Sequence, residues 1–458
     1  MSSAARPAPG TIRLLSATGG LGFTPPDPTR SFHRALEREP HAIIADAGSA
    51  DIGPLFLGSD GAYNDPEWEK LDLARLLDGV DRLGVPLVVG SCGGTGTDGA
   101  VRAFAAVVDE LGRARGRSYR TALLFSEQTR DWLHAALDAS PAAPPLTPLL
   151  PELSHEAIDA SDHLVAVMGA QPIAAALEQG AEVVLAGRAC DDALFAGAAI
   201  ALGARPGPAY LAGKLLENAS LVAEPFILRE SVIADLNEDQ VVLEPILPEQ
   251  RCTRTSVAAQ LMYERATPFD QAGPGGVLDL HGVAIEELDK RRVAVRGAVY
   301  REAPAALKVE GAGIAGRRSL CIAGCRDPRM IAALEPILDE VCERVELTGA
   351  RIAVSVFGRD AVMGGLEPVK VTGHEVAIVV ETLAPTQEDA NRACLLAKRL
   401  LFSAKFEGQK QTGGSIVSMI DEFLEAGRSY RWTVNHLVTV SSLVEPFVVE
   451  LRELGRRS

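Results

Sequence analysis

Short runs of consecutive apolar residues recur through the first 217 residues, and a Gly, Ser or Asp cluster follows most of them. Continuous apolarity is typical of strands that are buried on both faces, whereas half-exposed strands alternate polar and apolar residues. The pattern therefore predicts about six parallel strands whose sheet is covered by helices. The runs are TIRLLSA (11–17), AIIADAG (42–48), VPLVVGS (85–91), TALLFSE (121–127), HLVAVMG (163–169) and EVVLAGR (182–188).

The segments between these runs have the spacing of amphipathic helices. Residues 66–84, 98–116 and 171–180 carry apolar side chains at three- and four-residue steps, and each segment ends at Gly. Alternating strands and helices predict an α/β fold. We expect a mostly parallel, doubly wound sheet, with an eight-stranded barrel as the alternative if two weaker strands escape detection.

The pattern changes near residue 220, where runs such as 291–300 and 317–325 alternate polar and apolar residues. Alternation of this kind favours half-exposed, mostly antiparallel strands. Further along, residues 386–406 and 415–424 have helical spacing, and Thr386 with Asp389 approximates a capping box. We predict three domains: an α/β domain over 1–218 with a pocket at its strand ends, an α+β domain over 219–368, and a compact C-terminal α+β unit over 369–458.

Composition narrows the class of protein. With 458 residues, 47% apolar and 23% charged, the chain resembles a folded protein of two or three domains. Its net charge of −16 argues against a general binder of nucleic acid or of membrane surfaces. We find neither a membrane-spanning run of about 18 apolar residues nor a signal peptide. Together with seven scattered cysteines, this predicts a cytoplasmic protein.

Candidate functional residues follow the apolar runs, because ligands of open α/β sheets bind at the carboxyl ends of the strands. Turn formation and helix capping are the competing explanation for the same residue types. The candidates for proton transfer are Asp46, Asp98, Glu127 and Asp191. The candidates for substrate binding at these ends are Gly19, Gly20, Ser49, Ser91, Gly93, Gly94, Thr95 and Gln171.

The glycine-rich stretch at 90–99 matches neither the Walker motif nor the dinucleotide fingerprint, so nothing here predicts ATP or NAD as a cofactor. Its backbone could present N–H groups to an anion, or Thr97 or Asp98 could cap the following helix; the two are compatible. Cys92 is either a nucleophile on this turn or a small residue buried beneath it.

The segment AGRACDDAL brings one cation and two carboxylates to a single strand end. Arg188 is suited to a substrate carboxylate or phosphate, and Asp191 or Asp192 could act as a base. Alternatively, Asp191 caps the helix while Arg188 pairs with Asp192. A divalent metal on Asp46, Asp98 and Asp191 is chemically feasible, but no spacing demands it, so the cofactor stays open.

Near the C-terminus, Lys410 precedes two glycines and the expected helix at 415–424. A lysine and a glycine turn before a helix could form a second anion site. A hairpin-like connection is the alternative.

Several segments in the same order resemble the acyclic terpene utilisation family of AtuA-type proteins. They include AGRACDDALFAGAAIALG, YLAGKLLENASL, TSVAAQLMYERATP, APAALKVEG and YRWTVNHLVTV. The N-terminal part differs from the family pattern, which makes this a divergent branch. The resemblance implies a catabolic protein of small molecules, accompanied by a small co-encoded partner protein. It also adds weight to Lys214 and Glu217, which lie in the matching segments.

We therefore expect a catabolic enzyme, a hydratase, lyase or isomerase that acts on a small carboxylate or acyl-CoA thioester, and a homo-oligomer. One alternative is a hydrolase or acyl transferase with Cys92 or Ser91 as nucleophile. Another is a non-catalytic ligand-binding subunit that works with the partner protein. In the first case Arg188 and the 90–99 loop would bind the anionic group, while a carboxylate would move a proton next to a carbonyl.

Overall fold

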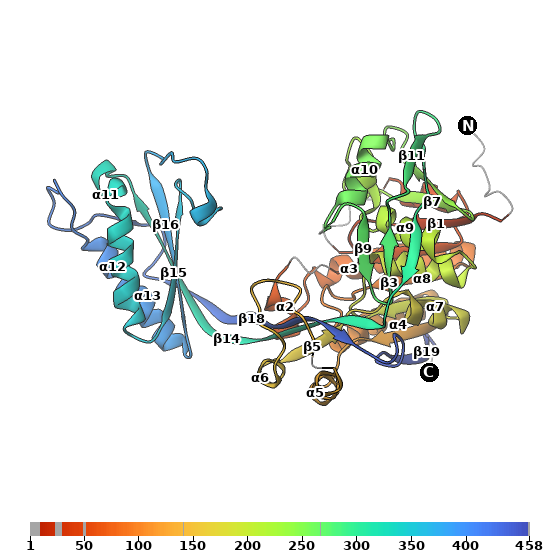
Figure 1. Cartoon of the computed structure of the whole chain (residues 1–458), viewed down its shortest axis with the longest axis horizontal. Helices are drawn as coiled ribbons and strands as arrows, with labels where there is room; N and C mark the ends of the chain where they lie inside the picture. Colours follow the sequence, from red (N-terminus) through yellow and green to blue (C-terminus); the bar gives the residue numbers. More distant parts are fainter. Residues whose placement is uncertain (1–9, 23–29, 49–51, 141, 266, 457–458) are drawn as a thin grey trace. The chain divides into compact units, whose positions relative to one another are not determined.

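The computed structural model describes residues 10–22, 30–48, 52–140, 142–265 and 267–456. The chain forms two compact units (Figure 1). Residues up to 313 and from 432 onward make the first unit, and Ile314–Arg431 make the second. Two long strands, β14 (Ala306–Cys325) and β18 (Leu424–Thr439), run from one unit into the other.

Parallel strands form the centre of the main sheet in the first unit. Across the sheet their order is β1 (Ile12–Ser16), β2 (Ala42–Asp46), β3 (Leu87–Gly90), β6 (Val183–Ala186) and β4 (Tyr119–Phe125). Successive side chains of a strand point to opposite faces, so Val88 packs in one hydrophobic cluster and Val89 in the other. Both faces are buried, which explains the continuous apolar runs, and the predicted α/β class is confirmed.

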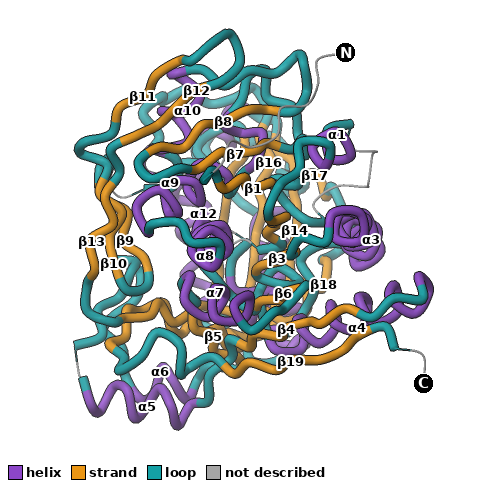
Figure 2. Tube along the Cα trace, turned by 90° about the vertical axis from the view of Figure 1, so that its right-hand side faces the viewer, coloured by secondary structure: helices purple, strands orange, loops and turns teal. Residues whose placement is uncertain are grey.

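Helices cover both faces of this sheet, as a doubly wound fold requires. One face carries α1 (Phe32–Leu36), α3 (Pro66–Leu83) and α4 (Asp98–Arg115). The opposite face carries α7 (Ala170–Glu178), α8 (Asp191–Ala201) and α9 (Pro206–Leu216). Figure 2 shows the strands stacked edge to edge between these two layers. None of the helices in the described ranges is long and apolar enough to cross a membrane.

Antiparallel strands extend the sheet at both edges. Beside β1 lie β7 (Val232–Leu236), β8 (Gln240–Pro245), β12 (Val293–Arg296) and β11 (Ala284–Glu287), and beside β4 lies β19 (Val448–Leu454). The predicted antiparallel strands after residue 220 are therefore present. The two compact units nevertheless differ from the three predicted domains, because these later strands continue the first sheet.

One predicted strand takes a different partner. β5 (His163–Ala166) pairs antiparallel with β14 and stays outside the parallel sheet. A small sheet of β9 (Asp270–Gly273), β10 (Gly276–Asp279) and β13 (Val299–Glu302) lies beside α9. The remaining helices of this unit are α2 (Pro54–Ser59), α5 (Arg130–Ala139), α6 (His155–Asp159), the 3-10 turn η1 (Ala219–Val222) and α10 (Arg254–Met262).

The second unit is an antiparallel sheet that packs against helices. Its strands run in the order β15 (Arg351–Phe357), β16 (Val376–Ala384), β14 and β17 (Val417–Ser418). The helices α11 (Pro328–Ala332), α12 (Leu334–Glu346) and α13 (Gln387–Phe402) supply its core, and the short turn η2 (Gly364–Leu366) lies between β15 and β16. The predicted cap is confirmed, since the Thr386 side chain accepts from the backbone N–H of Asp389.

The helix predicted at 415–424 is wrong. This segment contains β17 and turns, and the backbone N–H of Met419 donates to the carbonyl of Ile322 on β14. Pairing with the exposed edge of β14 satisfies the backbone groups of this segment, so the helical spacing of its side chains does not decide its structure.

A close backbone approach holds two strand ends of the main sheet together. Gly96, in the loop after β3, has φ +67°, and a Cβ there would lie 2.1 Å from the backbone N of Arg188. The carbonyl of Gly96 also accepts a hydrogen bond of 2.7 Å from Ser126 Oγ. Only glycine combines this conformation with this contact.

We expect Gly96→Ala to destabilise the protein far more than Gly84→Ala. Both glycines have φ +67°, but a Cβ at Gly84 meets nothing within 4 Å. Gly84→Ala should therefore cost about 1–2 kcal/mol from the left-handed backbone alone. Gly96→Ala adds a clash between the new Cβ and the backbone N of Arg188. Only a movement of the backbone can relieve this clash. Urea unfolding measures both values, and equal losses would contradict the close approach.

Candidate functional site

A cavity of about 640 Å³ lies at the carboxyl ends of the parallel strands in the first unit. Its polar wall contains Asp46 at the end of β2, Arg188 after β6 and Asp191 at the start of α8. Gly19 and Gly20, which follow β1, line it as well. The structure thus brings these five predicted residues together in one cavity.

Asp46 and Asp191 form an acid pair in this cavity. Burial raises the pKa of Asp46 well above its ordinary value, the charge of Asp191 raises it further, and Arg188 opposes the shift. Burial also raises the pKa of Asp191, although Arg188 and Lys214 oppose this. Asp46 Oδ2 accepts from the backbone N–H of Gly48 at 3.1 Å, whereas its buried Oδ1 has no hydrogen-bond partner among the described residues. That oxygen is available to a bound molecule.

Arg188 is held by a buried carboxylate from a distant part of the chain. Its Nε donates to Glu310 Oε2 at 2.9 Å, and both side chains are less than a tenth exposed. Lys308 Nζ lies 2.6 Å from the other oxygen of Glu310. Burial alone would raise the pKa of Glu310, but these two cations lower it to about 2. Burial likewise disfavours charged Arg188, yet Glu310, Asp191 and Asp46 leave its pKa raised, so it stays a cation.

The hydroxyl groups of Ser126 and Ser91 help to position Arg188. The backbone N–H of Arg188 donates to Ser126 Oγ at 2.8 Å, and its guanidinium lies 3.5 Å from Ser91 Oγ. Ser91 has a positive φ of 45°, which marks the sharp turn at the end of β3. Within the described ranges, its hydroxyl contacts Arg188 and the backbone of Ala189 and has no histidine partner. Ser91 is therefore placed as a positioning residue.

The glycine-rich loop caps a helix, and most of its backbone N–H groups are engaged within the protein. Thr97 is the N-cap of α4 and accepts from the backbone N–H of Ala100. The N–H groups of Ser91, Cys92, Gly94 and Gly96 donate to backbone carbonyls, and that of Asp98 donates to Glu127. These five N–H groups are therefore unavailable to the expected anion cradle.

Cys92 lies in the hydrophobic cluster beneath the loop and is fully buried. Burial, with the charges of Glu69 and Asp46, raises the pKa of its thiol well above the ordinary value. A reactive thiolate needs a cation and access to solvent, and Cys92 has the opposite surroundings. Its position is that of the buried structural residue.

Asp98 and Glu127 are paired with each other outside the cavity lining. Each side chain accepts from the other residue's backbone N–H, at 2.9 and 3.2 Å. His163 Nδ1 lies 2.7 Å from Glu127 Oε1; despite burial, this contact leaves the pKa of Glu127 lowered, and it raises that of His163. These carboxylates hold the start of α4 against β4. The trio Asp46, Asp98 and Asp191 is consequently not assembled as a metal site.

Lys214 and Glu217 form a second buried ion pair behind the cavity. Lys214 Nζ lies 2.6 Å from Glu217 Oε1 and donates to the carbonyl of Tyr263 at 2.8 Å. Glu217 itself lines the cavity, whereas Lys214 is absent from the lining. Asp192 faces the small sheet, where its Oδ2 accepts from Gln271 at 2.9 Å. Arg188 therefore pairs with Glu310, and not with Asp192 as the alternative interpretation expected.

The other described candidates from the sequence analysis do not line this cavity. Gly93 lines a different cavity, Gly94 packs against Tyr63, and Gln171 lies against Gly169. The buried hydroxyl of Thr95 has no hydrogen-bond partner. Lys410 is exposed in the second unit, and Ser49 lies outside the described residues.

Sequence reasoning missed a second group of lining residues. Its apolar and aromatic members are Leu21, Ile52, Phe56, Tyr63 and Tyr263, and its polar members are Asn64, Asn218 and Glu264. It also missed Glu310. A signal for Glu310 was present, because Lys308 and Glu310 are charged residues two positions apart in the otherwise uncharged stretch 306–316, and such residues of a strand share one face.

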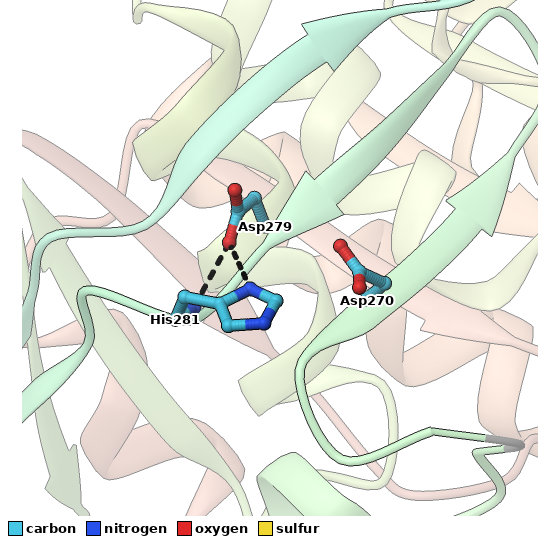
Figure 3. A group of neighbouring side chains, drawn as sticks. All are labelled: Asp270, Asp279 and His281. Atoms are coloured by element: carbon cyan, nitrogen blue, oxygen red, sulfur yellow. Dashed lines mark hydrogen bonds and ion pairs between the residues drawn. The ribbon is translucent and has the colours of Figure 1, made fainter.

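Asp270, Asp279 and His281 are a separate group whose ligand atoms all lie within 4.8 Å of one another (Figure 3). His281 Nδ1 lies 2.8 Å from Asp279 Oδ1. Arg301 bridges the carboxylates, at 2.6 Å from Asp270 and 3.2 Å from Asp279. The group is thus explained as a surface ion-pair network in which Arg301 supplies the positive charge.

The fold and the cavity define an α/β protein with an acid pair and a fixed arginine at its strand ends. The model of the acyclic terpene utilisation family protein AtuA matches residues 12–413. The chain belongs to this family, and the match includes the N-terminal half that we interpreted as divergent. The family is implicated in terpene catabolism. No curated protein matches the chain.

We expect Glu310→Gln to destabilise the protein by about 3–5 kcal/mol at pH 7, because it leaves Arg188 buried without its charged partner. The pKa of Glu310 is about 2 in the folded protein and about 4.5 when unfolded. Its stabilising effect is therefore complete above pH 4.5 and is lost as the pH falls toward 2.

Unfolding free energies of both proteins between pH 7 and pH 3 measure this dependence, and the difference between them should shrink on acidification. Glu286→Gln serves as control, since its pair with Arg296 is exposed and should contribute less than about 1 kcal/mol. A difference that stays constant with pH would contradict the role of the charge.

Proposed function

We propose that the chain is an enzyme that acts on a small carbonyl compound by adding or eliminating water or by isomerisation. Asp46 and Asp191 transfer the protons, and Arg188 binds the carbonyl oxygen. The observation that carries the proposal is the acid pair, in which each carboxyl has a raised pKa beside a permanent cation.

A pair of interacting carboxyls suits this chemistry because it holds one proton over a wide pH range. The protonated member can donate to one atom of the substrate while the ionised member accepts from another. Addition and elimination require both transfers. The cation of Arg188 would stabilise the negative charge that develops on the carbonyl oxygen.

The size and lining of the cavity support a small substrate. A volume of about 640 Å³ lies in the usual range for small-molecule sites. Phe56, Tyr63 and Tyr263 would contact the hydrocarbon part of the substrate. The acyl group of a thioester or a short carboxylic acid matches these requirements, and a bulky CoA carrier would extend outside.

Asp46→Asn and Asp191→Asn should each lower kcat by about 10²–10⁴-fold, with a smaller effect on KM, since each removes a proton-transfer group. In Asp191→Asn the alkaline limb of the pH–activity profile should shift to lower pH. The reason is that the charge of Asp191 raises the pKa of Asp46, and the variant lacks this charge. The control is Asp239→Asn, the same change at an exposed turn. Unchanged turnover in both cavity variants would refute the proposal.

The substrate can be found by incubating the purified chain with a metabolite pool and following masses. A gain or loss of one water indicates hydratase or lyase activity, and an isomer of equal mass indicates isomerisation. Binding without turnover, with activity restored by a co-encoded protein, would instead identify a ligand-binding subunit.

A further inference from the structure

A second cavity, of about 270 Å³, lies between α3 and α4 and shares no lining residue with the first. Its apolar wall contains Leu73 from α3 and Phe104 and Val107 from α4. Gly99, Ala100 and Ala103 of α4 also line it. These small side chains leave the space between the two helices unfilled, although interiors are usually close-packed.

Two carboxyl groups, Glu69 and Asp60, face this apolar space, and the described lining residues include no Lys, Arg or His. Glu69 is only 4% exposed, and its Oε1 has no hydrogen-bond partner in the part of the chain that the structure describes. Asp60 is tied to the helix start, since its Oδ1 accepts from Thr97 Oγ1 at 2.6 Å. A buried polar atom without a partner costs free energy that a ligand donor would recover.

Burial raises the pKa of Glu69 to about 7; Asn64 opposes the shift, and the charges of Asp72 and Asp65 add to it. A cation beside Glu69 would therefore find a carboxyl that ionises readily at neutral pH. An anion would meet two acidic groups, and none of the described lining residues carries a positive charge. The surroundings select a ligand by the sign of its head group.

We propose that this cavity is a second small-molecule site, which takes a short hydrocarbon chain with an ammonium head group. The chain lies against Leu73, Phe104 and Val107, and the head donates to Glu69 and Asp60. A bare metal ion fits poorly because most of the wall is apolar, and a carboxylate is repelled.

Calorimetric titration of the full chain at pH 7.5 tests the site, with n-hexylamine as the probe and n-hexanol and hexanoate as comparisons. We expect n-hexylamine to bind with one-to-one stoichiometry and at least about tenfold more tightly than n-hexanol, because its hydrogen bonds are charge-assisted. Hexanoate should not bind. Equal affinity for n-hexanol, or binding of hexanoate, would overturn the ammonium assignment.

Two variants locate the site. Glu69→Gln keeps the volume and removes the charge, and it should weaken n-hexylamine binding by at least about tenfold. Ala103→Leu fills the cavity and should abolish binding, with circular dichroism confirming its fold. Glu110→Gln, an exposed carboxylate on α4, is the matched control and should bind as the wild type does.

The first cavity also contains carboxylates, so Asp46→Asn must be titrated too. It should retain n-hexylamine binding. Loss of binding in Asp46→Asn but not in Glu69→Gln would place the amine in the first cavity and overturn the proposal. Wild-type affinity in both Glu69→Gln and Ala103→Leu would overturn it as well.

Discussion

The ion pair between Arg188 and Glu310 determines the electrostatics of the strand-end cavity. The charges of several carboxylates act on Arg188, but its recorded ion pair is with Glu310, where Nε lies 2.9 Å from Oε2. Burial raises the pKa values of Asp46 and Asp191, and Arg188 opposes both shifts without cancelling them. A fixed cation and an acid pair can thus coexist in one buried space. The charge of Glu310 itself adds to the rise in the pKa of Asp191.

The fold was predictable where local patterns and burial agree. Strands buried on both faces carry continuous apolar runs, and Thr386 caps its helix with a signal contained within a few residues. Prediction failed where a strand pairs with a segment that is far away in the sequence. β5 has the same apolar character as its neighbours but joins β14, and the segment at 415–424 has helical spacing but pairs with the edge of that strand. The local sequence of neither segment indicates that β14 is its pairing partner.

The site was predictable to the extent that it belongs to one sheet edge. Asp46 ends β2 and Arg188 follows β6, two parallel strands with only β3 between them, so the topology places both residues at the same edge of the sheet. Asp98 and Glu127 have equivalent positions, yet they cap the start of α4, because position after a strand does not determine which way a side chain points. Glu310 comes from β14, more than a hundred residues beyond Arg188, and only the tertiary structure places it there.

The charges around the cavity favour a neutral carbonyl over a free carboxylate. Glu217 is balanced by Lys214, and Arg188 is already balanced by Glu310. A carboxylate that entered would add a negative charge beside Asp46 and Asp191, and it would have to bring a proton with it to avoid repulsion. A thioester or ketone adds no charge and needs only a hydrogen-bond donor for its oxygen. The proton shared by the acid pair then stays available for transfer, so the electrostatics that select the substrate also preserve the group that reacts with it.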